Sequence, residues 1–154
     1  MKKQLQELLS MNYGRLLFLA MILFIGQGVA FSQGIKTVTS TANDGDGSLR
    51  QTISEAVDGD VIIFSGAIQT ITVDSSLNLG DKTLTIDGGG DVVLERSLTA
   101  VDSFRVVTIN ADSGKVVAIK NLTIQNGLTL NEDGGGLWAD NNTYGKTILE
   151  GLVF

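Results

Sequence analysis

Residues 47–64 read GSLRQTISEAVDGDVIIF, and this stretch predicts a capped helix followed by a short strand. Ser48 is a favoured N-cap residue, and Gln51 completes the Ser-x-x-Gln pattern of a capping box. The apolar residues that follow recur at helical spacing, which predicts a helix over residues 48–57. Gly59 ends this segment, because glycine adopts left-handed backbone at little cost.

Short β-branched runs surround the helix and are separated by clusters of Gly, Asn, Asp and Ser. Such runs are typical of strands joined by turns. The predicted strands are residues 37–41 before the helix and residues 61–64, 69–73, 83–87, 92–94, 105–109, 116–119 and 122–124 after it. The order predicts an all-β fold whose first end is covered by a short N-terminal capping helix.

Some of these runs resemble one another. Residues 83–88 read TLTIDG, residues 121–127 read NLTIQNG, and residues 106–110 are a looser copy. Self-similarity at this scale indicates stacked repeats, here the coils of a parallel β-helix (solenoid) with irregular spacing. We expect the recurring Leu-Thr-Ile-x-x-Gly units to stack like residues on like. The alternative is a β-sandwich, which needs strands paired through tight hairpin turns.

Residues 1–32 have the layout of a secretory signal peptide. Basic residues come first, residues 16–25 form an apolar run, and small residues follow it. Cleavage is expected after Ala30 or Ser32, and Met11 is an alternative start. The other interpretation is a membrane anchor, but spanning a bilayer takes about 20 apolar residues. The protein is therefore expected to be exported, to the extracellular space or the outer surface of the cell.

The composition narrows the classes of partner and of chemistry. The chain has 11 Lys and Arg against 17 Asp and Glu, a net charge of −6, with no basic cluster after the leader. Nucleic acids and anionic membranes require clustered cations, so neither is expected as a partner. The chain has no His, the commonest general base and zinc ligand, and no Cys for disulfides. It also has no Pro, which suits uninterrupted strand ladders.

The predicted organisation has three parts. Residues 1–32 are the signal peptide, residues 33–59 form the cap, and residues 60–154 form the first coils of a β-helix. The last segment, residues 146–154, resembles another strand with an apolar, uncovered end. Such ends invite association, and repeat proteins need a cap at each end. We expect a chain truncated at the C-terminus, whose downstream coils cover the open end.

Residues 37–56 and 59–64 resemble the N-terminal region of large bacterial surface proteins with a right-handed parallel β-helix. These include the group with a Cys-Ser-Leu-Arg-Glu-Ala motif and the choice-of-anchor proteins. Two positions depart from that motif, because Gly47 stands in place of the Cys and Gln51 in place of the Glu.

Residues 122–127 and 134–140 resemble the Gly-Gly-apolar repeats of the polymorphic outer-membrane protein family. Together the resemblances cover about residues 36–150. They imply a right-handed parallel β-helix, export, and a surface or secreted protein, often an adhesin. They also imply a C-terminal anchoring or sorting region, which is expected beyond Phe154.

One candidate metal site precedes the helix. Asp44, Asp46, Ser48 and Glu55 occupy positions 1, 3, 5 and 12 of a calcium-loop pattern, but its sixth position, a Gly, is Leu49 here. The alternative interpretation is an Asx-type turn that leads into the helix. Calcium is the one cofactor considered, and no residue is assigned to it.

Other polar residues have a functional and a structural interpretation. The Asp residues could line a groove together with Arg or Lys, as in polysaccharide lyases. Two of them could also form the pair of carboxylates that catalyses glycoside hydrolysis, but no pair has a diagnostic spacing. Turn positions explain these Asp residues equally well. The candidates are Asp87, Asp91, Asp112 and Asp133 with Arg96, Arg105 and Lys120.

Several glycine, amide and aromatic residues also allow both a functional and a structural interpretation. Residues 88–91 resemble a calcium-binding β-roll repeat but lack its spacing, so they predict a turn between coils, as do residues 134–136. The amides are expected in turns or stacked ladders, and the aromatics either pack or stack on a sugar ring. These side chains are Asn110, Asn121, Asn126, Trp138 and Tyr144.

Three hypotheses for function remain. The first is adhesion or binding of an extracellular glycan or a host or cell-surface protein, through a long side of the solenoid. The second is a polysaccharide lyase or glycoside hydrolase whose active site lies beyond Phe154. The third is a structural stalk. No catalytic, cofactor-binding or metal-binding residue is assigned, so whether the protein is an enzyme stays open, with binding favoured.

Overall fold

The computed structural model describes residue 3 and residues 33–130, 133–140 and 145–154. The chain divides into two compact units, Met1–Phe31 and Ser32–Phe154, and the fold described below is that of the second. The predicted signal peptide lies outside the described residues except for Lys3, so it stays a prediction.

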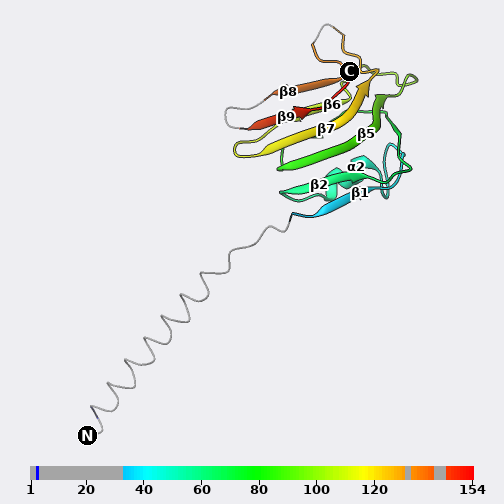
Figure 1. The fold of residues 1–154 in the computed structure, drawn as a ribbon. Coiled ribbons are helices and arrows are strands. Elements are labelled where there is room, and N and C mark those ends of the chain that lie inside the picture. The colour runs from blue at the N-terminus through cyan, green and yellow to red at the C-terminus, as the bar shows by residue number, and fades with distance from the viewer. Residues whose placement is uncertain (1–2, 4–32, 131–132, 141–144) are drawn as a thin grey trace. The chain divides into compact units, whose positions relative to one another are not determined.

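The second unit is a β-solenoid of about four turns (Figure 1). Its strands pair in parallel throughout, which confirms the all-β solenoid with one short helix. The elements are β1 (Ile35–Val38), α2 (Leu49–Glu55), β2 (Asp60–Phe64), β3 (Thr70–Val73), β4 (Leu77–Leu79), β5 (Leu84–Arg96), β6 (Val107–Asn110), β7 (Val116–Gln125), β8 (Leu137–Asp140) and β9 (Lys146–Glu150). The right-handed winding and the truncation stay predictions.

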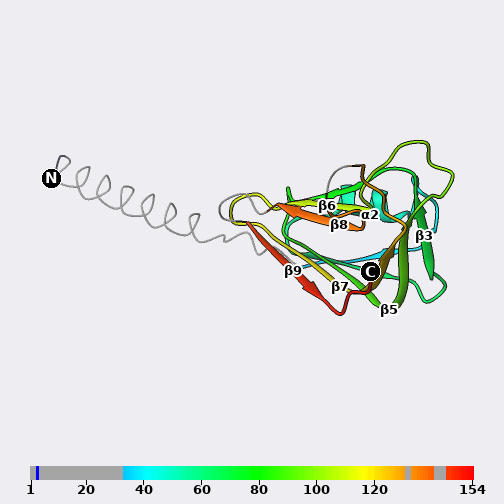
Figure 2. The ribbon, with the colours of Figure 1, turned by 90° about the horizontal axis from the view of Figure 1, so that it is seen from above.

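Three faces surround a common core (Figure 2). The β1 face contains β1, β2, β9 and the first parts of β5 and β7. The β3 face contains β3 and the second parts of β5 and β7. The β4 face is the separate sheet β4-β6-β8. One coil therefore passes over all three faces before it stacks on the next.

A glycine run bends β5 from the β1 face onto the β3 face. Gly89 and Gly90 have φ angles of 66° and 101°, and the register with β7 shifts between Asp87 and Val92. On β7 the same corner is turned at Asn121, whose φ is 51°. The prediction of a turn between coils at residues 88–91 was wrong, because the bend joins two faces of one coil.

The register also differs from the prediction that similar sequences stack on one another. Leu84 pairs with Val117 on the β1 face, whereas Leu122 pairs with Val92 on the β3 face. The two Leu-Thr-Ile units therefore lie on different faces. They look alike because every inward-facing strand needs the same alternation of apolar and polar residues, whichever face it occupies.

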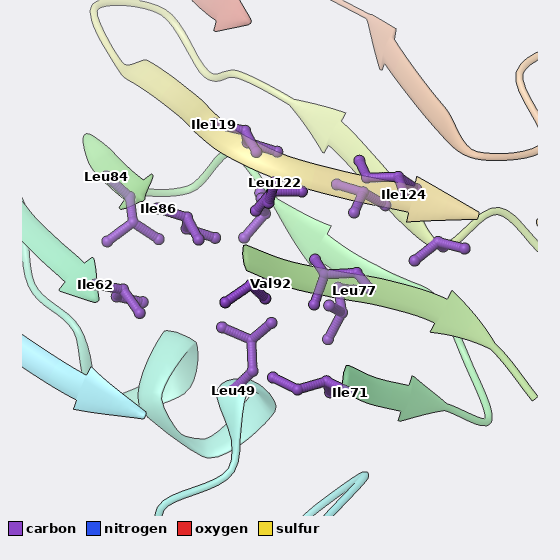
Figure 3. Packing of buried hydrophobic residues seen from close by; sticks show 14 of the residues in the cluster. Leu49, Ile62, Ile71, Leu77, Leu84, Ile86, Val92, Ile119, Leu122 and Ile124 are labelled. Atoms are coloured by element: carbon purple, nitrogen blue, oxygen red, sulfur yellow. The ribbon is translucent and has the colours of Figure 1, made fainter. Parts of the chain in front are cut away.

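Aliphatic side chains from all three faces fill the core. Figure 3 shows Leu84 and Ile86 of β5 pointing to the same interior as Ile119 and Leu122 of β7. All four are at most 3% exposed. Burial of each such side chain contributes about 1.5–3 kcal/mol, so a chain without disulfides can be held by this stack.

The helix begins as predicted and ends earlier. The hydroxyl of Ser48 accepts a hydrogen bond from the Gln51 amide at 3.2 Å, so Ser48 is the N-cap. The reciprocal half of the capping box is missing, because the Gln51 side chain donates to Glu55 Oε1 at 2.7 Å. The helix stops at Glu55 rather than at residue 57, since Ala56 is extended with ψ 149°. Gly59, with φ 92°, belongs to the turn into β2.

Candidate binding face

The outer surface of the β4 face carries a row of polar and aromatic residues. Asn78 of β4 is the cross-strand partner of Thr108 on β6, and Thr108 is the partner of Trp138 on β8. Their sequence neighbours Leu77 and Val107 point into the core and are at most 2% exposed. The period of two along each strand therefore directs this row outward.

Helix α2 lies against β4 and is attached to it by two cationic side chains. The guanidinium of Arg50 donates to the backbone oxygens of Ser75 at 2.8 Å and Ser76 at 3.0 Å. The ammonium of Lys82 donates to the backbone oxygens of Ile53 at 3.2 Å and Ser54 at 2.9 Å. These bonds satisfy carbonyls at the end of the helix and beside the edge strand, which the helix covers.

A cleft opens between α2 and the first strand of this face. We call it the cap cleft; its volume is about 390 Å³, within the roughly 300–1,000 Å³ typical of small-ligand sites. It combines cationic, polar and apolar side chains. Its lining residues are Arg50, Ile53, Ser54, Leu77, Asn78, Asp81 and Lys82.

A second cleft, the loop cleft, borders the same face and has a volume of about 330 Å³. Its polar wall includes Ser76 and Thr108, whose hydroxyls are hydrogen-bonded at 3.0 Å. The lining residues are Ser76, Ser103, Phe104, Arg105, Thr108, Thr129 and Leu130. The β4 face is thus flanked by a hollow on the helix side and another on the loop side.

Trp138 is engaged by a neighbouring cation. The guanidinium carbon of Arg105 lies 5.2 Å from the centroid of the indole ring, and its Nε and Nη2 donate to the Asp133 carbonyl at 3.2 and 3.1 Å. One ring face is therefore covered, which favours the packing interpretation of Trp138 over a free sugar platform. Tyr144 lies outside the described residues.

The two cations of the cap cleft are bound to neutral acceptors. Besides the carbonyls of Ser75 and Ser76, Arg50 donates to the carbonyl and the side-chain oxygen of Asn43. The ion pairs found between described residues are Lys115–Asp58 and Lys120–Glu150, and neither Arg50 nor Lys82 takes part in them.

Asp58 lies in the turn after α2, and its carboxylate accepts hydrogen bonds from Thr83 and Lys115, which come later in the chain. The pKa of Asp58 is lowered chiefly by a hydrogen bond from Lys115, with a further one from the Thr83 amide. Lys82 adds a weaker Coulombic contribution. Lys82 is therefore attracted to Asp58 at longer range, but Lys115 is the cation that binds it.

The four carboxylates considered for catalysis are spread over three corners of the solenoid. Asp87 and Asp91 flank the bend of β5, Asp112 lies between β6 and β7, and Asp133 lies between β7 and β8. Asp87 accepts from the Gly89 amide at 3.0 Å and from Asn121 Nδ2 at 3.1 Å. These bonds lower its pKa, the Gly89 amide most.

The cations paired with those carboxylates in the sequence hypothesis have different partners in the structure. Arg96 is 7% exposed, and it donates to the carbonyls of Ala100 and Asp102 while its guanidinium lies 5.3 Å from the ring of Phe104. It orders the loop after β5. Lys120 pairs with Glu150 at 3.1 Å. Lys120 is also the cross-strand partner of Asp87 and helps to lower the pKa of that carboxyl by Coulombic attraction. The structure therefore brings Asp87 and Lys120 side by side, but it does not gather the other sequence candidates with them into one groove.

The calcium-loop pattern is interrupted by the helix. Asp44 Oδ1 accepts from the Gly45 amide at 2.8 Å, as in a turn, and Ser48 serves as the N-cap of α2. Glu55, the twelfth position, is bonded to Gln51 at the end of that helix. Within the described ranges, no group of three or more acidic side chains is arranged to hold a metal ion.

The amide residues include two of the turn residues that the sequence predicts. Asn121 and Asn126 have φ angles of 51° and 60°, a conformation that Asn tolerates better than most residues. The Asn126 amide donates to Glu95 at 3.2 Å, beside a 2.9 Å bond from Gln125. Asn110 is exposed on β6.

Comparison with models of protein families, with curated proteins and with solved structures gives no match to this chain. In the part of the chain that the structure describes, no helix is both long and apolar enough to span a membrane.

Sequence reasoning did not identify the cap cleft. A signal existed for Arg50, which belongs to the Ser-Leu-Arg-Gln stretch that carries the family resemblance. Lys82, Asn78 and Asp81 gave none, because they lie in an ordinary turn and strand. They join Arg50 only when α2 lies against β4.

Proposed function

We propose that this protein is an exported binding protein of the cell surface, whose solenoid presents its β4 face to an extracellular glycan or protein. The observation that carries the proposal is the outward row Asn78, Thr108 and Trp138, flanked by the cap cleft and the loop cleft. A rigid face with hollows on either side allows many weak contacts to act together, which is how a scaffold without a reactive centre binds an extended ligand.

Export follows from the leader-like residues 1–32. Fusion of these residues to a reporter enzyme tests it: the proposal expects the reporter outside the cytoplasm, with its new N-terminus after position 30 or 32. A reporter that stays in the cytoplasm would contradict the cell-surface assignment.

Binding is tested by applying the purified protein to arrays of glycans and of extracellular proteins. The proposal expects reproducible retention of at least one ligand class, reduced when Thr108 is replaced by Glu on the β4 face. The matched control is Thr123→Glu on the β3 face, since Thr123 is, like Thr108, a half-buried strand threonine, and its cross-strand partners Val93 and Val153 carry no charge. Equal retention by both variants would contradict the choice of face, and release of shortened glycan chains would contradict a purely binding role.

We further propose that additional coils cover the apolar end beyond β8 and β9. Leu149 is 45% exposed although its cross-strand partner Ile119 is buried, and Val153 and Phe154 are 59% and 70% exposed. Stacked coils normally bury such side chains against their neighbours. Sedimentation tests this: the protein of 154 residues should self-associate, and Leu149→Lys should reduce that association. A monomer at all concentrations would contradict the proposal.

A further inference from the structure

We infer that the cap cleft is a binding site for an anionic sugar, whose carboxylate or sulfate lies against Arg50 and Lys82. This inference rests on the proposed glycan-binding function and adds the chemical class of the ligand and its place. The site lies where the capping helix α2 meets β4, at one end of the β4 face.

The first support is the state of the two cations. Both are fixed by backbone carbonyls rather than by carboxylates, so their positive charges are oriented but not neutralised by direct pairing. A guanidinium and an ammonium each keep at least one N–H donor beyond these bonds. Because the side chains are already held, an anion that binds them costs little additional side-chain ordering.

The second support is the charge of the lining. The cleft wall carries Arg50 and Lys82 against one carboxylate, Asp81, in a chain whose net charge is −6. Asp58 attracts Lys82 at longer range, but its carboxylate is bound by Lys115. The cleft is therefore locally cationic on an acidic protein. Complementary charge of this kind favours an anionic ligand, and the attraction weakens as salt screens it.

The third support is the remainder of the lining, which fits a sugar ring better than a bare inorganic anion. Ser54 and Asn78 supply a hydroxyl and an amide at exposed positions, and Asp81 can accept from sugar hydroxyls. Half-buried Ile53 supplies apolar surface for the C–H face of a ring. Sites that combine apolar lining with a few convergent polar groups are typical of small-ligand recognition.

Arg50 and Lys82 also fasten the helix, so the test does not depend on removing them. The decisive variants are Ser54→Leu and Asn78→Leu, which fill the cleft and leave both cations in place. The matched control is Asn110→Leu, since Asn110 is an exposed residue of the same type on the same sheet and does not line the cleft. Circular dichroism verifies that each variant is folded.

Affinity is measured by calorimetry with glucuronate oligomers, sulfated glucose oligomers and neutral glucose oligomers of equal length, at low and high salt. We expect at least one anionic series to bind, the neutral series to bind at least about tenfold more weakly, and affinity to fall with salt. Ser54→Leu and Asn78→Leu should each lower that affinity about tenfold, and Asn110→Leu should not. Comparison of the two anionic series identifies the carboxylate or the sulfate as the recognised group.

The remaining outcomes of this experiment separate failure of the site from failure of the proposed function. Anionic binding that the two cleft variants leave unchanged would overturn this site and leave the proposed function standing. The same holds if only neutral glycans or only proteins bind. Failure to bind any glycan or protein would contradict both the site and the function.

Discussion

Replacement of Leu49 by Ala tests whether the capping helix is part of the solenoid core. Leu49 is the first residue of α2, and its side chain is 1% exposed. Figure 3 shows it pointing into the interior toward Ile71, Leu77 and Val92, which belong to two different faces. The side chain therefore joins the cap to the first coils rather than covering them from outside.

The expected loss in the free energy of unfolding follows from the nearly complete burial of the Leu49 side chain. Leu-to-Ala changes in protein cores destabilise by about 2–5 kcal/mol, because the transfer free energy is lost and a cavity remains. Leu49 lies near the end of the stack, where the helix can partly settle into the space, so we expect about 3 kcal/mol. With a urea dependence of about 2 kcal/mol per M, the midpoint of unfolding falls by about 1.5 M.

Urea unfolding followed by circular dichroism measures this change. The control is Leu98→Ala, since Leu98 is 79% exposed and its truncation should alter stability by less than about 0.5 kcal/mol. The fluorescence of Trp138, the single tryptophan, reports from β8 at the opposite end of the β4 sheet from the helix. A loss below about 1 kcal/mol for Leu49→Ala would refute the assignment of the helix to the core.

Two further predictions concern the turns. A Cβ atom at Gly80 would lie 1.8 Å from the backbone oxygen of Asn110, and Gly80 has a φ of 144°; Gly80→Ala should therefore cost at least about 2 kcal/mol in urea unfolding. Gly66→Ala, where no atom lies within 4 Å, is the control, and equal losses would contradict the register between these coils. The second prediction uses the lowered pKa of Asp58: its stabilisation is complete above the ordinary carboxyl pKa and is lost as pH falls through the lowered folded value. Lys115→Met should therefore lose less stability than the native protein between about pH 5 and pH 2, and an identical pH dependence would contradict the role of this pair.

The alternation of residues predicted most of the strands, but it missed β4 and β8 and did not predict how the strands stack. In β5, Leu84 and Ile86 face inward and Thr85 faces outward, as the sequence pattern indicates. The register between strands depends instead on the number of residues that form each corner. The bend of β5 takes a glycine run, whereas the same corner of β7 takes Asn121, so similar runs end on different faces.

The cap cleft could not be predicted from the sequence either, because it too depends on how distant segments stack. Four Asp residues were considered as potential catalysts, yet in the fold they are spread over three corners, and only Asp87 and Asp91 share a bend. Arg50 and Lys82 are far apart in the sequence, and each resembles an ordinary surface cation. Only the position of α2 beside β4, set by the length of the connections around it, brings them to one cleft.

All statements about faces and clefts depend on the parallel register between successive coils, and a disulfide cross-link measures it directly. The chain has no Cys, so paired substitutions give an unambiguous result. Thr85 and Ala118 are cross-strand partners, and strand partners lie close enough for a disulfide, which needs Cα atoms about 4.4–6.8 Å apart. The account predicts rapid cross-linking of Thr85→Cys with Ala118→Cys, and none of Thr85→Cys with Thr123→Cys, the pair expected if the Leu-Thr-Ile units stacked on each other. The reverse result would contradict the fold and the binding face built on it.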